Sequence, residues 1–294
     1  MLRHHWIALC LALLSACKPA TAPLPTPTPS ATDRMNTEIT IKLGEPGAEF
    51  VKRNLGLVKV EKQPAGLNFY SIAWTTSNQG KVLLENGASS LHLANVLSVQ
   101  ANEDAEAPAT SPDSFQDVTV GTNLGAQPLI SHDQARLSLY GILHDALAAG
   151  WRPLITESDP RLTGKDRFDY ALTRDSMIGL DARYVPSLAE WMRIKDSTPW
   201  FLYAGHVVLE LNFQRDQSRM DPTQPGSYFL SFLFQTDVEH FRGYAGTDHR
   251  KDWRQVLPGA LADAHRHRSQ VEAELKSQGF HIDESYQGLT PPSQ

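Results

Sequence analysis

Apolar and polar residues alternate with a period of two through much of residues 37–100. Ile39, Ile41 and Leu43 are separated by polar side chains, and the runs 69–74, 81–85 and 91–99 are rich in β-branched, aromatic and aliphatic residues. This period places successive side chains on opposite faces of a β-sheet, so we expect three or four strands here. Residues 37–100 therefore predict a small β-rich lobe, with a short helix over 47–54.

The next segment, residues 101–127, breaks this pattern. It has no lysine or arginine, and it carries five carboxylates and two prolines: Glu103, Asp104, Glu106, Asp113, Asp117, Pro108 and Pro112. Acidic residues clustered with prolines are typical of exposed loops. We expect a long acidic connection between two lobes, and the alternative is that its charge steers a basic partner.

Helical spacing dominates the part that follows. Leu139, Leu143 and Leu147 fall on one stripe of a helix that Ser131 would cap and Gly150 would end. Ser187 and Glu190 have the spacing of a capping box, which predicts a helix from 187 to about 196. Residues 252–278 repeat apolar side chains at helical spacing, and Pro258 predicts either a kink there or the start of a further helix.

Two alternating runs, 206–214 and 228–235, predict an antiparallel hairpin. Residues 215–226, which connect them, form a longer tip than the two to five residues of most hairpin loops. With a further strand over 151–156, these elements predict a C-terminal lobe over 128–288, in which helices pack on an antiparallel sheet. Because helices and strands are segregated along the chain, we predict the α+β class in two lobes.

The N-terminus has the arrangement of a secretory signal. Arg3 and two histidines precede an apolar stretch, residues 6–14, that is too short to cross a bilayer as a mature helix. The chain continues with Leu14, Ser15, Ala16 and Cys17. This tetrapeptide looks like a bacterial lipobox, which implies a signal peptide over 1–16 and a diacylated Cys17. The alternative is an ordinary signal peptide with a chance cysteine.

Residues 17–36 combine the expected anchor with five prolines among small residues, which predicts an extended tether. Acyl chains on Cys17 would supply the hydrophobic signals that stable membrane binding requires. Lys18 stands where an aspartate would resemble the inner-membrane retention signal of enteric lipoproteins. We therefore expect an outer-membrane lipoprotein that faces the periplasm, with the inner membrane as the alternative.

The composition argues against several kinds of partner and site. The net charge of the 294 residues is −6, and non-specific nucleic-acid binding depends on clustered lysine and arginine, so we expect no nucleic-acid partner. The two cysteines are Cys10, which would leave with the signal, and Cys17, which lipid would block. We therefore expect neither a cysteine nucleophile nor a thiolate metal site in the mature protein.

Familiar catalytic patterns are missing from the sequence, which has no nucleophile elbow, no phosphate-binding glycine loop and no His-Glu-x-x-His. His265 and His267, with Arg266 and Arg268, predict a solvated basic face on the last helix. The charged segment that contains Asp159, Asp166, Asp169, Arg161 and Arg167 predicts local ion pairs, and the alternative is that it binds a cation or an anionic group. His206 and Glu210 would lie too far apart on a strand to share a metal. We expect no enzymatic activity, metal or cofactor.

Four strings in the C-terminal half carry a family resemblance: Trp-Arg-Pro-Leu-Ile at 151–155, Ser-Asp-Pro-Arg-Leu at 158–162, Leu-Ala-Glu-Trp-Met at 188–192 and Glu-His-Phe-Arg-Gly-Tyr at 239–244. In these strings the chain resembles uncharacterised proteobacterial lipoproteins that are associated with type VI secretion and its lipase or phospholipase effectors. The resemblance covers roughly residues 128–288 and assigns no single binding residue. It implies an immunity protein, a periplasmic lipoprotein that binds and blocks a membrane-lipid hydrolase delivered by neighbouring cells.

These observations favour a binding module whose protein partner is a toxic effector. The alternatives are an envelope structural or assembly lipoprotein, and a hydrolase that uses Asp159, Asp166, Asp169 or His206. For the binding module, we expect the partner surface to include the hairpin tip, whose mixed charges and flexible apolar side chain suit an adaptable contact: Arg215, Arg219, Met220 and Asp221. Trp200, just before the hairpin, is expected to be buried.

Overall fold

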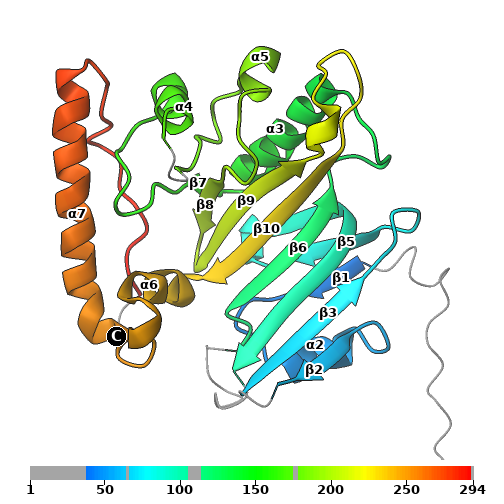
Figure 1. Ribbon diagram of the computed structural model, residues 1–294. Coiled ribbons are helices and arrows are strands. Elements are labelled where there is room, and N and C mark those ends of the chain that lie inside the picture. The colour runs from blue at the N-terminus through cyan, green and yellow to red at the C-terminus, as the bar shows by residue number, and fades with distance from the viewer. Residues whose placement is uncertain (1–37, 64–65, 105–113, 175–177, 293–294) are drawn as a thin grey trace, which may run out of the picture.

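The computed structural model describes residues 38–63, 66–104, 114–174 and 178–292. The expected signal peptide, lipobox and tether, with Cys17, lie outside the described residues. Within the described residues, a ten-stranded sheet runs through the whole body and helices lie beside it (Figure 1). In chain order the helices and strands are β1 (Glu38–Ile41), α2 (Gly47–Arg53), β2 (Lys59–Lys62), β3 (Leu67–Ala73), β4 (Gly80–Leu84), β5 (Leu91–Asp104), β6 (Asp117–Asn123), α3 (His132–Ala148), β7 (Arg152–Pro153), α4 (Gly164–Leu172), α5 (Leu188–Trp191), β8 (Trp200–Ala204), β9 (Val207–Arg215), β10 (Tyr228–Thr236), α6 (Asp237–Ala245) and α7 (Trp253–Ser277), with 3₁₀ turns at Gly87–Ser89, Gln217–Arg219 and Thr247–His249.

The predicted α+β class is confirmed, and both halves of the chain contribute to one sheet. The strand order is β1-β4-β5-β6-β10-β9-β8-β7, and the β2–β3 hairpin adds to β5. Among the described strands, β1 and β4 pair in parallel and the other pairs are antiparallel. Strand β6 pairs with β5 on one side and β10 on the other, so main-chain hydrogen bonding continues from the N-terminal half into the C-terminal half.

The expectation that residues 101–127 form an exposed acidic connection is wrong for much of that segment. Residues 101–104 end β5, and residues 117–123 form β6. The carboxylates in the strands have specific partners, because Glu103 accepts hydrogen bonds from the Tyr70 hydroxyl at 2.6 Å and the Gly47 amide at 3.1 Å. Residues 105–113 lie outside the described residues. The acidic composition concealed a strand that occupies the centre of the sheet.

One face of the sheet is packed and the other is largely open. On the packed face, Val120, Phe232 and Leu211 from three neighbouring strands are buried in the same core as Leu139 of α3. Figure 1 shows α3 behind these strands. On the opposite face Phe229 and Ser231 are only partly buried, and Gln214 is exposed. The period of two in the sequence therefore separates a core face from a solvent face, as pleated strands require.

Helix-start signals in the sequence are confirmed. The Ser131 hydroxyl accepts a hydrogen bond from the Gln134 amide at 3.2 Å and caps α3. Both arms of the Ser187–Glu190 capping box form, but α5 ends at Trp191 and not near residue 196. The C-terminal helix α7 continues across Pro258 without starting a second helix, as its unbroken bounds show. Proline near a helix start removes few backbone bonds, so the helix tolerates it.

The Glu190 carboxylate makes a prediction about pH. The Ser187 amide is the largest of several hydrogen bonds that lower the pKa of Glu190 from 4.5 to about 2. The stabilisation is therefore complete above the unfolded-state pKa and is lost as the pH falls through the folded-state value. Between pH 4.5 and pH 2, we expect the melting temperature of Glu190→Gln to fall less than that of the wild type. Circular dichroism measures both melting temperatures. Parallel pH profiles for the two proteins would contradict this role.

Candidate functional site

The hairpin of β9 and β10 carries the candidate partner surface at its far end. The two strands pair without a break until Arg215 stands opposite Tyr228. In the connection, Asp216 accepts hydrogen bonds from the amide and hydroxyl of Ser218, at 3.0 and 2.6 Å. Asp221 accepts from the amide and hydroxyl of Thr223 in the same way, at 2.9 and 2.7 Å. These Asx-type turns give the long tip a defined backbone path.

The base of the tip is fixed to the start of α3. Ile130 and Gly226 exchange two main-chain hydrogen bonds of 3.0 and 2.9 Å. Behind them the buried His132 ring places Nδ1 at 2.5 Å from the Tyr228 hydroxyl, which accepts from the Trp191 indole at 3.2 Å. A Cβ atom on Gly226 would lie 2.6 Å from His132 Cε1, so this close approach requires glycine. The tip thus stands on a packed, hydrogen-bonded aromatic base.

Arg215, expected in the partner surface, belongs to this base. Its side chain is 4% exposed, and its Nε lies 3.3 Å from the Asp196 carboxylate. Its two η nitrogens donate to the carbonyls of Trp191 and Ile194, where a longer α5 would have used its own amides. Its guanidinium also lies over the Phe213 ring. The expectation is wrong because the Arg215 guanidinium is buried. It donates to carbonyls at and just after the end of the short helix α5.

The other predicted tip residues do reach the surface. Arg219 is exposed and pairs with Asp216 at 3.4 Å, Asp221 is exposed, and Met220 is partly buried. Trp200 is fully buried at the start of β8, as expected, so it does not contribute an aromatic anchor. The exposed part of the tip is therefore residues 216–219 and 221–225.

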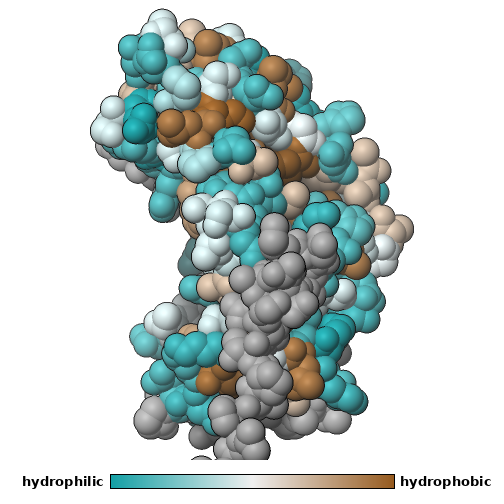
Figure 2. Space-filling view, turned by 90° about the vertical axis from the view of Figure 1, so that its right-hand side faces the viewer, coloured by the Kyte–Doolittle hydropathy of each residue, from teal (hydrophilic) through white to brown (hydrophobic). Residues whose placement is uncertain are grey.

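Three exposed hydrophobic residues lie on the segments that support the tip base, and the sequence pattern did not reveal them. Leu129, Leu137 and Val185 are 44%, 53% and 52% exposed. Leu129 precedes the Ile130 bridge to the tip, Leu137 lies on α3, and Val185 precedes Pro186, whose carbonyl accepts from Arg136 of α3 at 3.0 Å. Figure 2 shows hydrophobic patches at this upper end of the molecule. We refer to residues 216–225 with Leu129, Leu137 and Val185 as the tip end.

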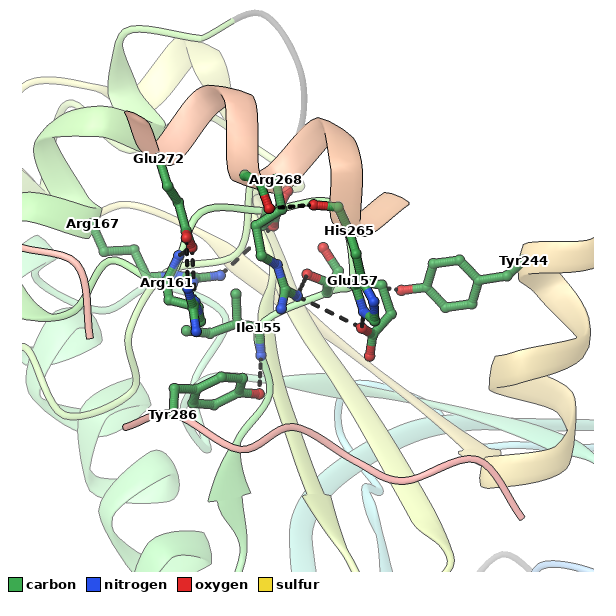
Figure 3. A network of polar contacts seen from close by, with 12 residues as sticks. Ile155, Glu157, Arg161, Arg167, Tyr244, His265, Arg268, Glu272 and Tyr286 are labelled. Atoms are coloured by element: carbon green, nitrogen blue, oxygen red, sulfur yellow. Dashed lines mark hydrogen bonds and ion pairs between the residues drawn. The ribbon is translucent and has the colours of Figure 1, made fainter. Parts of the chain in front are cut away.

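A second polar cluster joins α7 to the segment after β7 (Figure 3). Arg161 forms a two-pronged ion pair with Glu272, with distances of 2.9 and 2.7 Å. His265 Nε2 lies 2.6 Å from Glu157 Oε2, and Arg268 Nη2 donates to the Thr156 carbonyl at 2.7 Å. We call the five polar residues the α7 clamp: Glu157, Arg161, His265, Arg268 and Glu272. The clamp holds α7 against the body.

The expected solvated basic face on α7 is therefore wrong for Arg268, whose side chain is 13% exposed, whereas His265 is exposed and also pairs with Glu157. Both side chains contact the segment after β7, whereas Arg266 pairs with Asp263 along the helix and His267 is exposed. Helical spacing placed the four basic residues correctly around the axis but did not identify which side meets a partner segment. The sequence did not reveal the partner of this helix side. That partner is Glu157, a buried carboxylate that lies far from α7 in the sequence.

The residues considered for a hydrolase have separate partners. Asp169 pairs with Lys165 at 2.5 Å, as the ion-pair interpretation predicts. Asp166 accepts the His281 amide at 3.4 Å, and His206 lies 2.7 Å from Asp237 at the turn before β9. Burial raises the pKa of Asp159, and the nearby Arg167 opposes this shift. Among the described residues, no group of three or more His, Cys, Asp or Glu side chains is placed to hold a metal ion.

Comparisons with known proteins identified no relative of this chain. No family model matches the chain, and neither the curated proteins nor the solved structures contain a match. In the part of the chain that the structure describes, no helix is both long and apolar enough to cross a membrane. The functional interpretation therefore depends on the residues and geometry of this chain.

The base of the tip makes a prediction about stability. Gly226→Ala should destabilise the fold by about 1–3 kcal/mol, because its new methyl group would push into the buried His132 ring. Gly141→Ala is the matched control, since nothing lies within 4 Å of a Cβ at that position of α3. The free energy of unfolding in urea measures both. A Gly226→Ala variant as stable as the wild type would show that the tip base is not tightly packed.

Proposed function

We propose that this protein is a lipoprotein, anchored through Cys17 in the outer membrane and facing the periplasm, which acts by binding a protein partner and has no catalytic role. The proposed partner is a lipase or phospholipase effector of type VI secretion, which this chain would block as an immunity protein. The observation that most supports a binding role is the tip end, where three large hydrophobic side chains are exposed beside an ordered polar loop.

The composition of the tip end suits a protein interface. Leu129, Leu137 and Val185 would supply apolar area, and each fully buried side chain of this size is worth roughly 1.5–3 kcal/mol. Arg219 and Asp221 would supply the charged rim that gives specificity more than affinity. Because the turns and the aromatic base already order the tip, a partner would pay little of the entropy that a disordered loop loses on binding.

The proposed anchor suits the proposed target. An extended segment of about 3 Å per residue over 18–34 would hold the body within roughly 50 Å of the lipid surface. A hydrolase of membrane lipids acts at that surface, so the tether would keep the inhibitor where its target works. This part of the proposal depends on residues outside those that the structure describes.

Replacing the anchor residue tests the location. In Cys17→Ser the nucleophile that receives the acyl chains is lost, so we expect the protein to move from the membrane fraction to the soluble periplasmic fraction. Fractionation followed by immunoblotting measures this. Unchanged membrane association of Cys17→Ser would contradict the lipoprotein assignment.

Changes at the tip end test the binding role. We expect replacement of residues 216–224 by a Gly-Ser turn, and separately Leu137→Ser, to change the melting temperature little but to weaken inhibition at least tenfold. The measurement is the residual activity of the proposed lipase effector, purified and titrated with each variant. The matched control is Leu55→Ser, which alters a hydrophobic residue that is 80% exposed after α2. Inhibition by the shortened variant at wild-type concentration would remove the tip from the interface.

A further inference from the structure

A cavity of about 350 Å³ lies between the β7–β8 edge of the sheet and the C-terminal segment. Pro153, Leu154 and Ile155 form one wall, and Asp283 with residues 285–287 forms another. The C-terminal segment is held in place because the Tyr286 hydroxyl accepts the Ile155 amide at 2.7 Å, a contact visible in Figure 3. A cavity of this volume falls within the range of small-molecule sites.

The charged lining of the cavity is unbalanced towards arginine. Arg152, Arg167 and Arg183 line it, together with only two carboxylates, Asp181 and Asp283. Both carboxylates already have close partners. Asp181 accepts from the Gly164 amide at 2.9 Å and from the Arg183 guanidinium at 3.0 Å, while Asp283 accepts the amide and hydroxyl of Ser285. Arg152 and Arg167 are the two lining arginines that form no hydrogen bond or close ion pair with these carboxylates.

Arg167 is the more unusual of these two side chains. It is 2% exposed, and its Nε donates to the Gly179 carbonyl. Neither η nitrogen makes a hydrogen bond within the described residues. The Asp159 carboxylate approaches Arg167 Nη2 only to 3.8 Å, and its Oδ2 also has no hydrogen bond there. Buried donors without acceptors are costly, so this guanidinium has unused capacity for a strong hydrogen-bonded pair.

Arg152 offers the second free cation, at the solvent side of the cavity. Its backbone pairs with Tyr203 in the β7–β8 ladder, and its side chain is exposed. In the described part of the chain, its guanidinium has no hydrogen bond or ion pair. The cavity thus has a buried guanidinium, an exposed guanidinium and an apolar wall within one concave surface.

We propose that this cavity binds a small amphiphilic monoanion, a carboxylate on a short aliphatic body. The carboxylate accepts hydrogen bonds from Arg152, since the planar guanidinium fork matches the two oxygens of a carboxylate. The buried positive charge of Arg167 attracts the carboxylate across the cavity wall. The aliphatic body packs against Leu154, Ile155 and Leu162. This site is independent of the tip end and of the proposed protein partner.

Calorimetric titration of the folded body with octanoate tests the site. We expect saturable binding of one octanoate per chain, and at least tenfold weaker binding of both octanol, which lacks the charge, and acetate, which lacks the tail. Arg152→Gln should keep the wild-type melting temperature and weaken octanoate binding about tenfold, the value of one charge-assisted hydrogen bond. Arg193→Gln is the matched control, because Arg193 is exposed after α5 and does not line the cavity.

Asp159→Asn supplies a test in the opposite direction. Removing the carboxylate nearest to Arg167 should strengthen octanoate binding, because the guanidinium then has no competing anion beside it. No binding of octanoate at millimolar concentration would overturn the proposal. Equal affinity for octanoate and octanol, or wild-type affinity in Arg152→Gln, would overturn it as well.

Discussion

The pairing of β6 with both β5 and β10 is the constraint on which the rest of the structure depends. It joins strands from the two halves of the chain into one sheet, so a single packed face serves both. It also fixes the direction of β10, which begins at the tip and ends at α6. At roughly 3.3 Å per residue, the nine residues of β10 separate these two ends by about 30 Å.

The two ends differ in physical character. At the tip end, short Asx-type turns and a buried His132–Tyr228 contact support a surface with exposed leucine and valine. Beyond the opposite end, α6 leads into α7, which partly buried ion pairs such as Arg161–Glu272 hold against the body. A two-pronged pair of this kind fixes geometry more than it adds net stability, because desolvation offsets much of the attraction. The clamp positions the segments that form the arginine-lined cavity, and the tip base positions the proposed interface.

Local signals in the sequence predicted local structure well. The Ser131 cap, the Ser187–Glu190 box and the alternating hairpin runs all form, because each depends on residues within a few positions of one another. The sequence did not reveal which distant segments of the chain pair with one another. The composition of residues 101–127 resembled a loop, but Val118 and Val120 fill a place between two strands that come from distant parts of the chain. Arg215 and Arg268 looked like surface charges because their partners, carbonyls at the end of α5 and the Thr156 carbonyl, are distant in sequence. The exposure of Leu137 likewise depends on which helix face the sheet leaves uncovered.

We propose that the tip end is the part of the molecule that meets a protein partner. Hydrogen–deuterium exchange of the purified protein, alone and mixed with the proposed lipase effector, tests this proposal. We expect slower amide exchange in the complex at residues 129–137, 184–187 and 216–225, with little change in α7 and the C-terminal segment. Protection confined to α7 or to the open sheet face, with the tip end unchanged, would contradict it.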